Sequence, residues 1–131
     1  SYRFLLNEMI ANTDAKIILI QPYLLPADDA MQANCVIANV NNYIPMVEEM
    51  GDVICTLAAE YKLDIIYLAE ILKQQHEKGS TYIELAVDAI HPTALTSSIL
   101  ADQIIMALGV KDYVPAFGDF DTSEIAAKYN K

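Results

Sequence analysis

Two side chains able to exchange protons stand close together in the segment Asp88-Ala-Ile-His91-Pro92. A carboxylate three residues before an imidazole, on a non-helical turn that Pro92 fixes, can fold back and accept the Nδ1–H of the histidine. Nε2 then faces outward as a base. The spacing predicts the base and the orienting group of a hydrolytic triad, with His91 as base and Asp88 as orienter. The alternative is an ordinary turn, in which Asp88 serves the backbone and His91 has no chemical role.

The charge balance excludes some classes of partner. Eighteen acidic residues against eight basic ones give the 131-residue chain a formal net charge of −10. Binding of nucleic acid needs clustered Lys and Arg to replace counterions, so we expect no nucleic-acid partner. Anionic membrane surfaces are disfavoured for the same reason. We also expect no membrane span, since no apolar run approaches the roughly 18 residues that a spanning helix needs.

The cysteines and the first residues of the chain indicate the cellular compartment in which we expect the protein. Cys35 and Cys55 are a single pair without C-x-x-C spacing, and we expect free thiols in a reducing compartment. The first residues contain no basic segment leading into an apolar stretch, so we expect a signal peptide to be absent or removed. Together these features predict a cytoplasmic protein.

The elements that must position Asp88 and His91 follow from apolar periodicity. The pattern predicts helices over residues 2–11, about 37–61, 69–78, 93–108 and from about 122, and strands over 16–21 and 64–68. The first helix has no N-cap residue before it, which suggests that an upstream segment was cut away. Residues 82–92 have no clear period. In the helix over 93–108, we expect Leu95, Ile99, Ile104 and Leu108 to face inward.

The strand over residues 16–21 contains four consecutive apolar residues, 17–20, which predicts burial on both faces and hence a parallel sheet. Residues 22–34 then form a loop at its carboxyl end, where open α/β sheets place their ligands. Tyr23 follows the strand directly, so it either lines a substrate cleft or packs in the core. With 54% hydrophobic residues and alternating elements, the chain is predicted to be one α/β domain with a parallel sheet.

From about residue 2 to residue 110 the chain resembles the C-terminal part of the SGNH hydrolases, also called the GDSL lipase/esterase family. The opening helix, the strand and loop over 15–26, the helix ending at 57–62, the strand over 64–68 and the block Asp88-Ala-Ile-His-Pro-Thr93 follow the family's order. The resemblance implies a three-layer α/β/α flavodoxin-like fold, of which residues 1–110 are the C-terminal part. Residues 111–131 would be an acidic C-terminal tail with a short helix. Carried over, the triad roles of orienter and base fall on Asp88 and His91.

The family's nucleophile block, G-D-S, and its G-x-N-D block are missing from this chain. Gly118-Asp-Phe120 matches the first of these only in part, with Phe120 where the serine belongs. None of the five serines stands in a G-D-S context: Ser1, Ser80, Ser97, Ser98 and Ser123. We therefore expect the chain by itself to be inactive, with the nucleophile and oxyanion donors supplied from outside it.

The resemblance implies a serine ester hydrolase that acts on small-molecule or carbohydrate esters with short acyl groups and needs no metal or organic cofactor. Two strands make a poor sheet, so we expect the strand over 16–21 to carry an exposed edge. That edge would favour a homo-oligomer or segment exchange. The alternative function is a non-catalytic α/β binding or interaction domain, in which the D-x-x-H-P turn is a coincidence.

Overall fold

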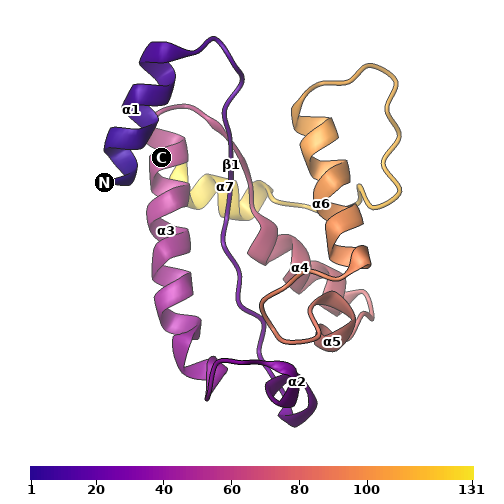
Figure 1. The fold of residues 1–131 in the computed structure, drawn as a ribbon. Coiled ribbons are helices and arrows are strands. Elements are labelled where there is room, and N and C mark those ends of the chain that lie inside the picture. The colour runs from indigo at the N-terminus through magenta and orange to yellow at the C-terminus, as the bar shows by residue number, and fades with distance from the viewer.

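The computed structural model describes all 131 residues. Helices pack on both faces of one small parallel sheet (Figure 1). The elements are α1 (Tyr2–Asn12), β1 (Ile18–Ile20), α2 (Asp29–Asn34), the 3-10 turn η1 (Val40–Tyr43), α3 (Ile44–Glu60), β2 (Asp64–Ile66), α4 (Leu68–Glu77), α5 (Tyr82–Leu85), α6 (Ala94–Ala107) and α7 (Ser123–Tyr129). The predicted α/β class is confirmed. No helix is both long and apolar enough to cross a membrane.

The sheet contains only the two strands β1 and β2, which run parallel with Leu19 opposite Ile65. The second edge of β1 has no partner strand. Along β1, Leu19 is 6% exposed whereas Ile20 is 38% exposed. The prediction that this strand is buried on both faces is therefore wrong for Ile20, because no layer covers its side chain.

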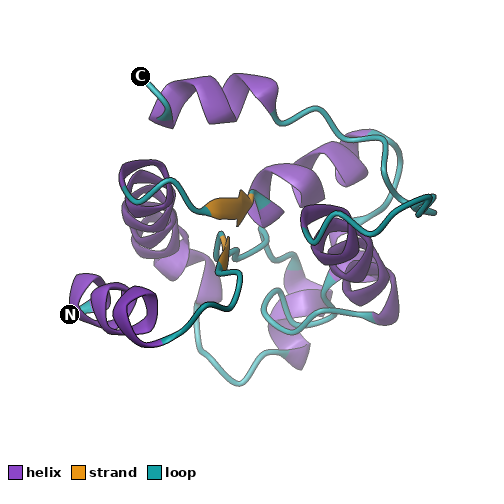
Figure 2. Cartoon of the chain, turned by 90° about the horizontal axis from the view of Figure 1, so that it is seen from above, coloured by secondary structure: helices purple, strands orange, loops and turns teal.

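Two apolar clusters hold the layers together. Viewed from above, α1 and α3 lie on one side of the strands, and α4, α5 and α6 lie on the other (Figure 2). On the first side, Leu6 of α1 packs with Leu19 and Leu57. On the second side, Ile66 at the end of β2 belongs to the larger cluster, together with Leu85 and other side chains of the loops and helices. The larger cluster is the one that supports the segment around Asp88.

Hydrogen bonds at the helix starts explain several departures from the predicted elements. Ser1 caps α1, since its Oγ accepts the N–H of Phe4 at 3.3 Å, so the expectation of an uncapped first helix is wrong. The predicted loop over 22–34 contains α2, whose first turn is capped by Asp28. The stretch without a clear period contains α5, which a capping box between Thr81 and Glu84 starts.

The long helices largely follow the predictions. α3 begins later than residue 37, after η1 and with Pro45 in its first turn, where a proline is tolerated. α4 ends before Gly79, whose φ of 120° suits the left-handed position after a helix. In α6, Ile99 is fully buried, but Leu108 is 52% exposed. The prediction for Leu108 is wrong because α6 ends at Ala107, so the apolar face stops one turn earlier.

Residues 111–131 fold back over the α/β unit. Asp102 of α6 accepts hydrogen bonds from the hydroxyl of Tyr113 and, at 2.8 Å, from the N–H of Phe117. At the far end, α7 packs on α3, where the hydroxyl of Tyr129 donates to Asp52. The short helix predicted in this segment is thus present as α7 and lies along one edge of the molecule (Figure 2).

Candidate functional site

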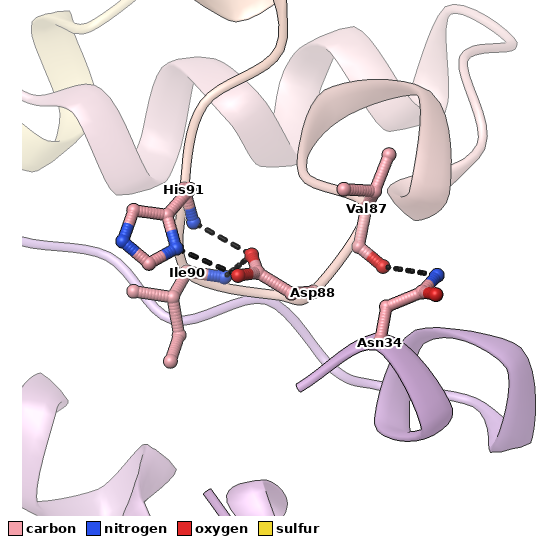
Figure 3. A network of polar contacts seen from close by, with 5 residues as sticks. All are labelled: Asn34, Val87, Asp88, Ile90 and His91. Carbon is pink, nitrogen blue, oxygen red and sulfur yellow. Dashed lines mark hydrogen bonds and ion pairs between the residues drawn. The ribbon is translucent and has the colours of Figure 1, made fainter. Parts of the chain in front are cut away.

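Asp88 and His91 form a hydrogen-bonded pair on the segment between α5 and α6 (Figure 3). His91 Nδ1 lies 2.6 Å from Oδ2 of Asp88. Because an ionised carboxylate can only accept, Nδ1 must carry the hydrogen, and the lone pair of a neutral imidazole then resides on Nε2. The His91 side chain is 76% exposed, so Nε2 is open to a reactant.

The other oxygen of Asp88 fixes the carboxylate in place. Oδ1 accepts the N–H of Ile90 at 3.0 Å and the N–H of His91 at 2.8 Å (Figure 3). The side-chain bond to His91, followed by the backbone bonds, lowers the pKa of Asp88 to about 2. The carboxylate is therefore ionised wherever the imidazole could serve as a base. The carboxylate of Asp88 thus bonds both the backbone of the turn and the ring of His91.

The backbone of this turn is held from several directions. Asn34 Nδ2 donates to the carbonyl of Val87 at 3.2 Å (Figure 3), and the N–H of Leu25 donates to the carbonyl of Ala89 at 3.1 Å. Ala89 is fully buried with φ of 71°, a conformation that costs an L residue about 1 kcal/mol or more. Thr93 closes the turn, because its Oγ1 donates to the carbonyl of Glu84 at 2.6 Å. The dyad thus sits on an anchored turn.

No nucleophile of this chain engages the dyad. No serine, threonine or tyrosine hydroxyl is hydrogen-bonded to Nε2 of His91. Ser97 and Ser98 lie inside α6, and Ser123 binds Asp121. Of the remaining serines, Ser1 caps α1, and Ser80 accepts a hydrogen bond from the side chain of Gln75. The dyad has the parts of a base and its orienter and no hydroxyl to activate.

Tyr23 lies between the dyad and a separate cleft. Its ring packs against the larger apolar cluster, and its hydroxyl is buried without a hydrogen-bond partner. Burial, with a smaller contribution from the charge of Asp88, raises the pKa of Tyr23 to about 12. Tyr23 also lines a cleft of about 370 Å³. Tyr23 therefore packs in the core and also borders a cleft.

The cleft lies beyond the carboxyl ends of β1 and β2, between α3, α4 and α7. Its floor includes Gln21 and Gly51, which the sequence analysis did not identify as functional. Gln21 is 9% exposed, and its Oε1 accepts the N–H of Ala69 at 3.1 Å. The sequence did contain a signal for Gln21, since it is a polar residue at the carboxyl end of an apolar strand. Open α/β sheets bind their ligands at that end of their strands.

The thiols and acidic groups form no further site. Cys35 and Cys55 are both free, and burial raises the pKa of Cys55 to about 11, so its thiol is unreactive at neutral pH. No three His, Cys, Asp or Glu side chains are close enough together to hold a metal ion.

We compared the chain with models of protein families, with curated proteins and with solved structures, and none of the three comparisons gives a match. The functional argument therefore depends on the geometry of the chain's own residues.

Proposed function

We propose that this chain supplies the general base and its orienting carboxylate to a serine ester hydrolase. His91 is the base and Asp88 is the orienter. The observation that carries the proposal is the 2.6 Å contact between His91 Nδ1 and Asp88 Oδ2, together with the exposure of the other ring nitrogen. The resemblance to SGNH hydrolases favours short acyl esters as substrates, including acetylated carbohydrates, and the flavodoxin-like fold as the complete architecture.

In the proposed reaction a serine hydroxyl attacks the ester carbonyl while His91 Nε2 takes its proton. Asp88 keeps Nδ1–H in place and stabilises the imidazolium that forms. The imidazolium then returns its proton to the departing alcohol, which leaves an acyl-enzyme. Water repeats the sequence with His91 as base and releases the carboxylic acid and the free serine.

The nucleophile in this proposal comes from outside the described residues. The support is chemical, since Nε2 of His91 has no hydroxyl within hydrogen-bond reach in this chain. The unpaired edge of β1 offers backbone groups to which a further strand could bond. A strand added there would extend the sheet on the β1 side.

The first test measures the base directly. Nitrogen NMR of the 131-residue chain at neutral pH is expected to find His91 as the Nδ1–H tautomer, with Nε2 unprotonated in its neutral form. Asp88→Asn should abolish this preference because an amide can also donate to Nδ1. An Nε2–H tautomer in the unsubstituted chain contradicts the proposed role of His91.

The second test measures hydrolysis of p-nitrophenyl butyrate by the product of the complete reading frame. We expect His91→Ala to lower kcat by about a thousandfold or more, as loss of a triad base does. His76→Ala is the matched control, since His76 lies on α4, where it stacks on Tyr82, and not on the turn that carries His91. Undiminished hydrolysis after His91→Ala excludes the proposal.

A non-catalytic α/β binding domain is the second candidate. The observation that favours it is the absence of any hydroxyl at the dyad, which leaves Asp88 and His91 as a turn-fixing pair. It predicts that the complete reading frame shows no esterase activity and no labelling by a fluorophosphonate, which reacts with activated serines.

A further inference from the structure

We propose that the cleft between α3, α4 and α7 binds a short-chain monocarboxylate, with the carboxylate on Gln21 and the alkyl chain along α3 and α7. The cleft lies at the carboxyl ends of both strands and has a volume of about 370 Å³, which falls within the usual range of about 300–1,000 Å³ for small-molecule sites. The proposal stands on this cleft alone and does not require the chain to hydrolyse esters.

Gln21 provides the polar floor of the cleft. Its side chain is nine-tenths buried, and Oε1 accepts the N–H groups of Ala69 and Glu70 at 3.1 and 3.5 Å. These bonds settle the orientation of the amide, because only its oxygen can accept. Nε2 is left without any partner in the chain and lines the cleft. An amide donor that faces a cleft and has no partner in the chain can bind a ligand that brings an acceptor.

The bonds to Gln21 also strengthen that donor. Ala69 and Glu70 are in the first turn of α4, which begins at Leu68, so their N–H groups belong to the positive end of the helix dipole. An amide whose oxygen accepts two hydrogen bonds is polarised and becomes a better donor through its nitrogen. Gln21 thus transmits part of the positive potential of α4 to the cleft, which favours an anionic acceptor.

Gly51 of α3 leaves room in front of this donor. A Cβ at position 51 would lie 3.8 Å from Nε2 of Gln21 and 3.6 Å from its Cγ. The missing side chain therefore leaves open the approach that an acceptor atom needs.

The charges at the rim also favour a carboxylate. Lys73 of α4 makes no ion pair with any carboxylate, whereas Lys128 lies 3.4 Å from Asp52. Asp52 additionally accepts from the hydroxyl of Tyr129, a bond that lowers its pKa, so Asp52 is ionised and is the nearest carboxylate to Lys128. Lys73 is left as the cation available to a ligand, while Glu48 at the opposite wall discourages a second negative group. With Glu48 and Asp52 also in the lining, one unpaired cation suits a ligand with a single negative charge better than a dianion.

The apolar part of the lining includes Ile44 and Val47 of α3 and Ile125 of α7. An alkyl chain of a few carbons can lie against them, and each buried methylene contributes about 0.8 kcal/mol. A carboxylate head with a tail of about five carbons therefore suits both parts of the cleft.

The test titrates hexanoate into the isotope-labelled chain and follows amide chemical shifts. We expect hexanoate to bind at least about fivefold more tightly than hexanamide, which has the same shape without the charge, and more tightly than acetate, which lacks the tail. The shifts should centre on Gln21, Gly51 and Ala69. Equal affinity for hexanoate and hexanamide overturns the proposal, as do shifts centred elsewhere.

Gln21→Glu keeps an oxygen for the amides of α4 but places a negative oxygen where Nε2 stood. It should weaken hexanoate binding by about tenfold or more, whereas Gln103→Glu on α6 adds the same charge away from the cleft and should leave it unchanged. Lys73→Gln is the second variant, with Lys111→Gln as its control, and should weaken binding about threefold. Retained affinity in folded Gln21→Glu or in Lys73→Gln refutes the assignment.

The test also separates this proposal from the hydrolase function. His91→Ala should bind hexanoate within about twofold of the unsubstituted chain, because His91 does not line the cleft. If His91→Ala loses esterase activity but still binds hexanoate, the result bears on the role of the dyad alone. If Gln21→Glu loses hexanoate binding, the result bears on the cleft alone.

Discussion

Replacing Gly51 by alanine should stabilise the chain. Gly51 is buried within α3, has an ordinary helical φ, and has only side-chain atoms of Gln21 near its missing Cβ, at 3.6 and 3.8 Å. These are normal van der Waals distances, so the methyl group fits without displacing anything. Alanine is favoured over glycine inside a helix by about 1 kcal/mol. The free energy of unfolding should therefore rise by about 1 kcal/mol, which corresponds to about 4 °C in Tm for a chain of this size.

Urea unfolding followed by circular dichroism measures this change, and Ala59→Gly in the same helix should lower stability by about the same amount. The new methyl group also stands in front of Nε2 of Gln21, so hexanoate affinity should fall about fivefold in the same variant. A Gly51→Ala variant that is less stable than the unsubstituted chain refutes the packing argument. If Gly51→Ala is more stable but binds hexanoate with unchanged affinity, the packing argument holds and only the assignment of the cleft floor is refuted.

Three further predictions concern the Asp88–His91 pair, the cap of α6 and the attachment of α7 to α3. The pKa of Asp88 is lowered from 3.8 to about 2 in the folded chain, so this carboxylate stabilises the fold above pH 3.8 and loses that contribution as the pH falls through about 2. Urea unfolding between pH 5 and pH 2 should therefore depend less on pH in Asp88→Asn than in the unsubstituted chain. An unchanged pH profile in Asp88→Asn contradicts the contact with His91. Thr93→Val removes the hydroxyl that caps α6 and bonds the carbonyl of Glu84, and should cost about 1–2 kcal/mol in thermal unfolding, with a negligible loss counting against that cap. Tyr129→Phe deletes the bond to Asp52, so hydrogen exchange should become faster in α7 while α4 keeps its protection; equal protection of α7 in both proteins disproves the anchoring role.

Local patterns in the sequence were sufficient to predict the dyad. Asp88 and His91 are three residues apart on one turn, so their contact requires only the conformation of that turn. The same holds for most helices, whose apolar period is written in consecutive residues. The capping box of Thr81 and Glu84 is also visible in the sequence as T-x-x-E. The helix α5 that it starts has only four residues, which is too short for an apolar period to predict it.

The cleft could not be predicted in this way. Gln21 follows β1, Gly51 is in α3 and Ala69 begins α4, so their meeting depends on the parallel pairing of the strands and on the packing of two helices. The exposure of Ile20 and Leu108 has a similar origin, because apolar periodicity identifies a face but does not show where its covering layer ends.

The parallel pairing of β1 and β2 also affects how quickly the chain can fold. Ile18 must find Asp64 across all of α2, η1 and α3, and closing a loop of that length costs about 3 kcal/mol of chain entropy before the sheet gains anything. α3 needs only local contacts and forms much faster. A preformed α3 shortens the search, which makes this helix the expected nucleus of folding. Changes that strengthen α3 should then speed refolding and have little effect on the rate of unfolding.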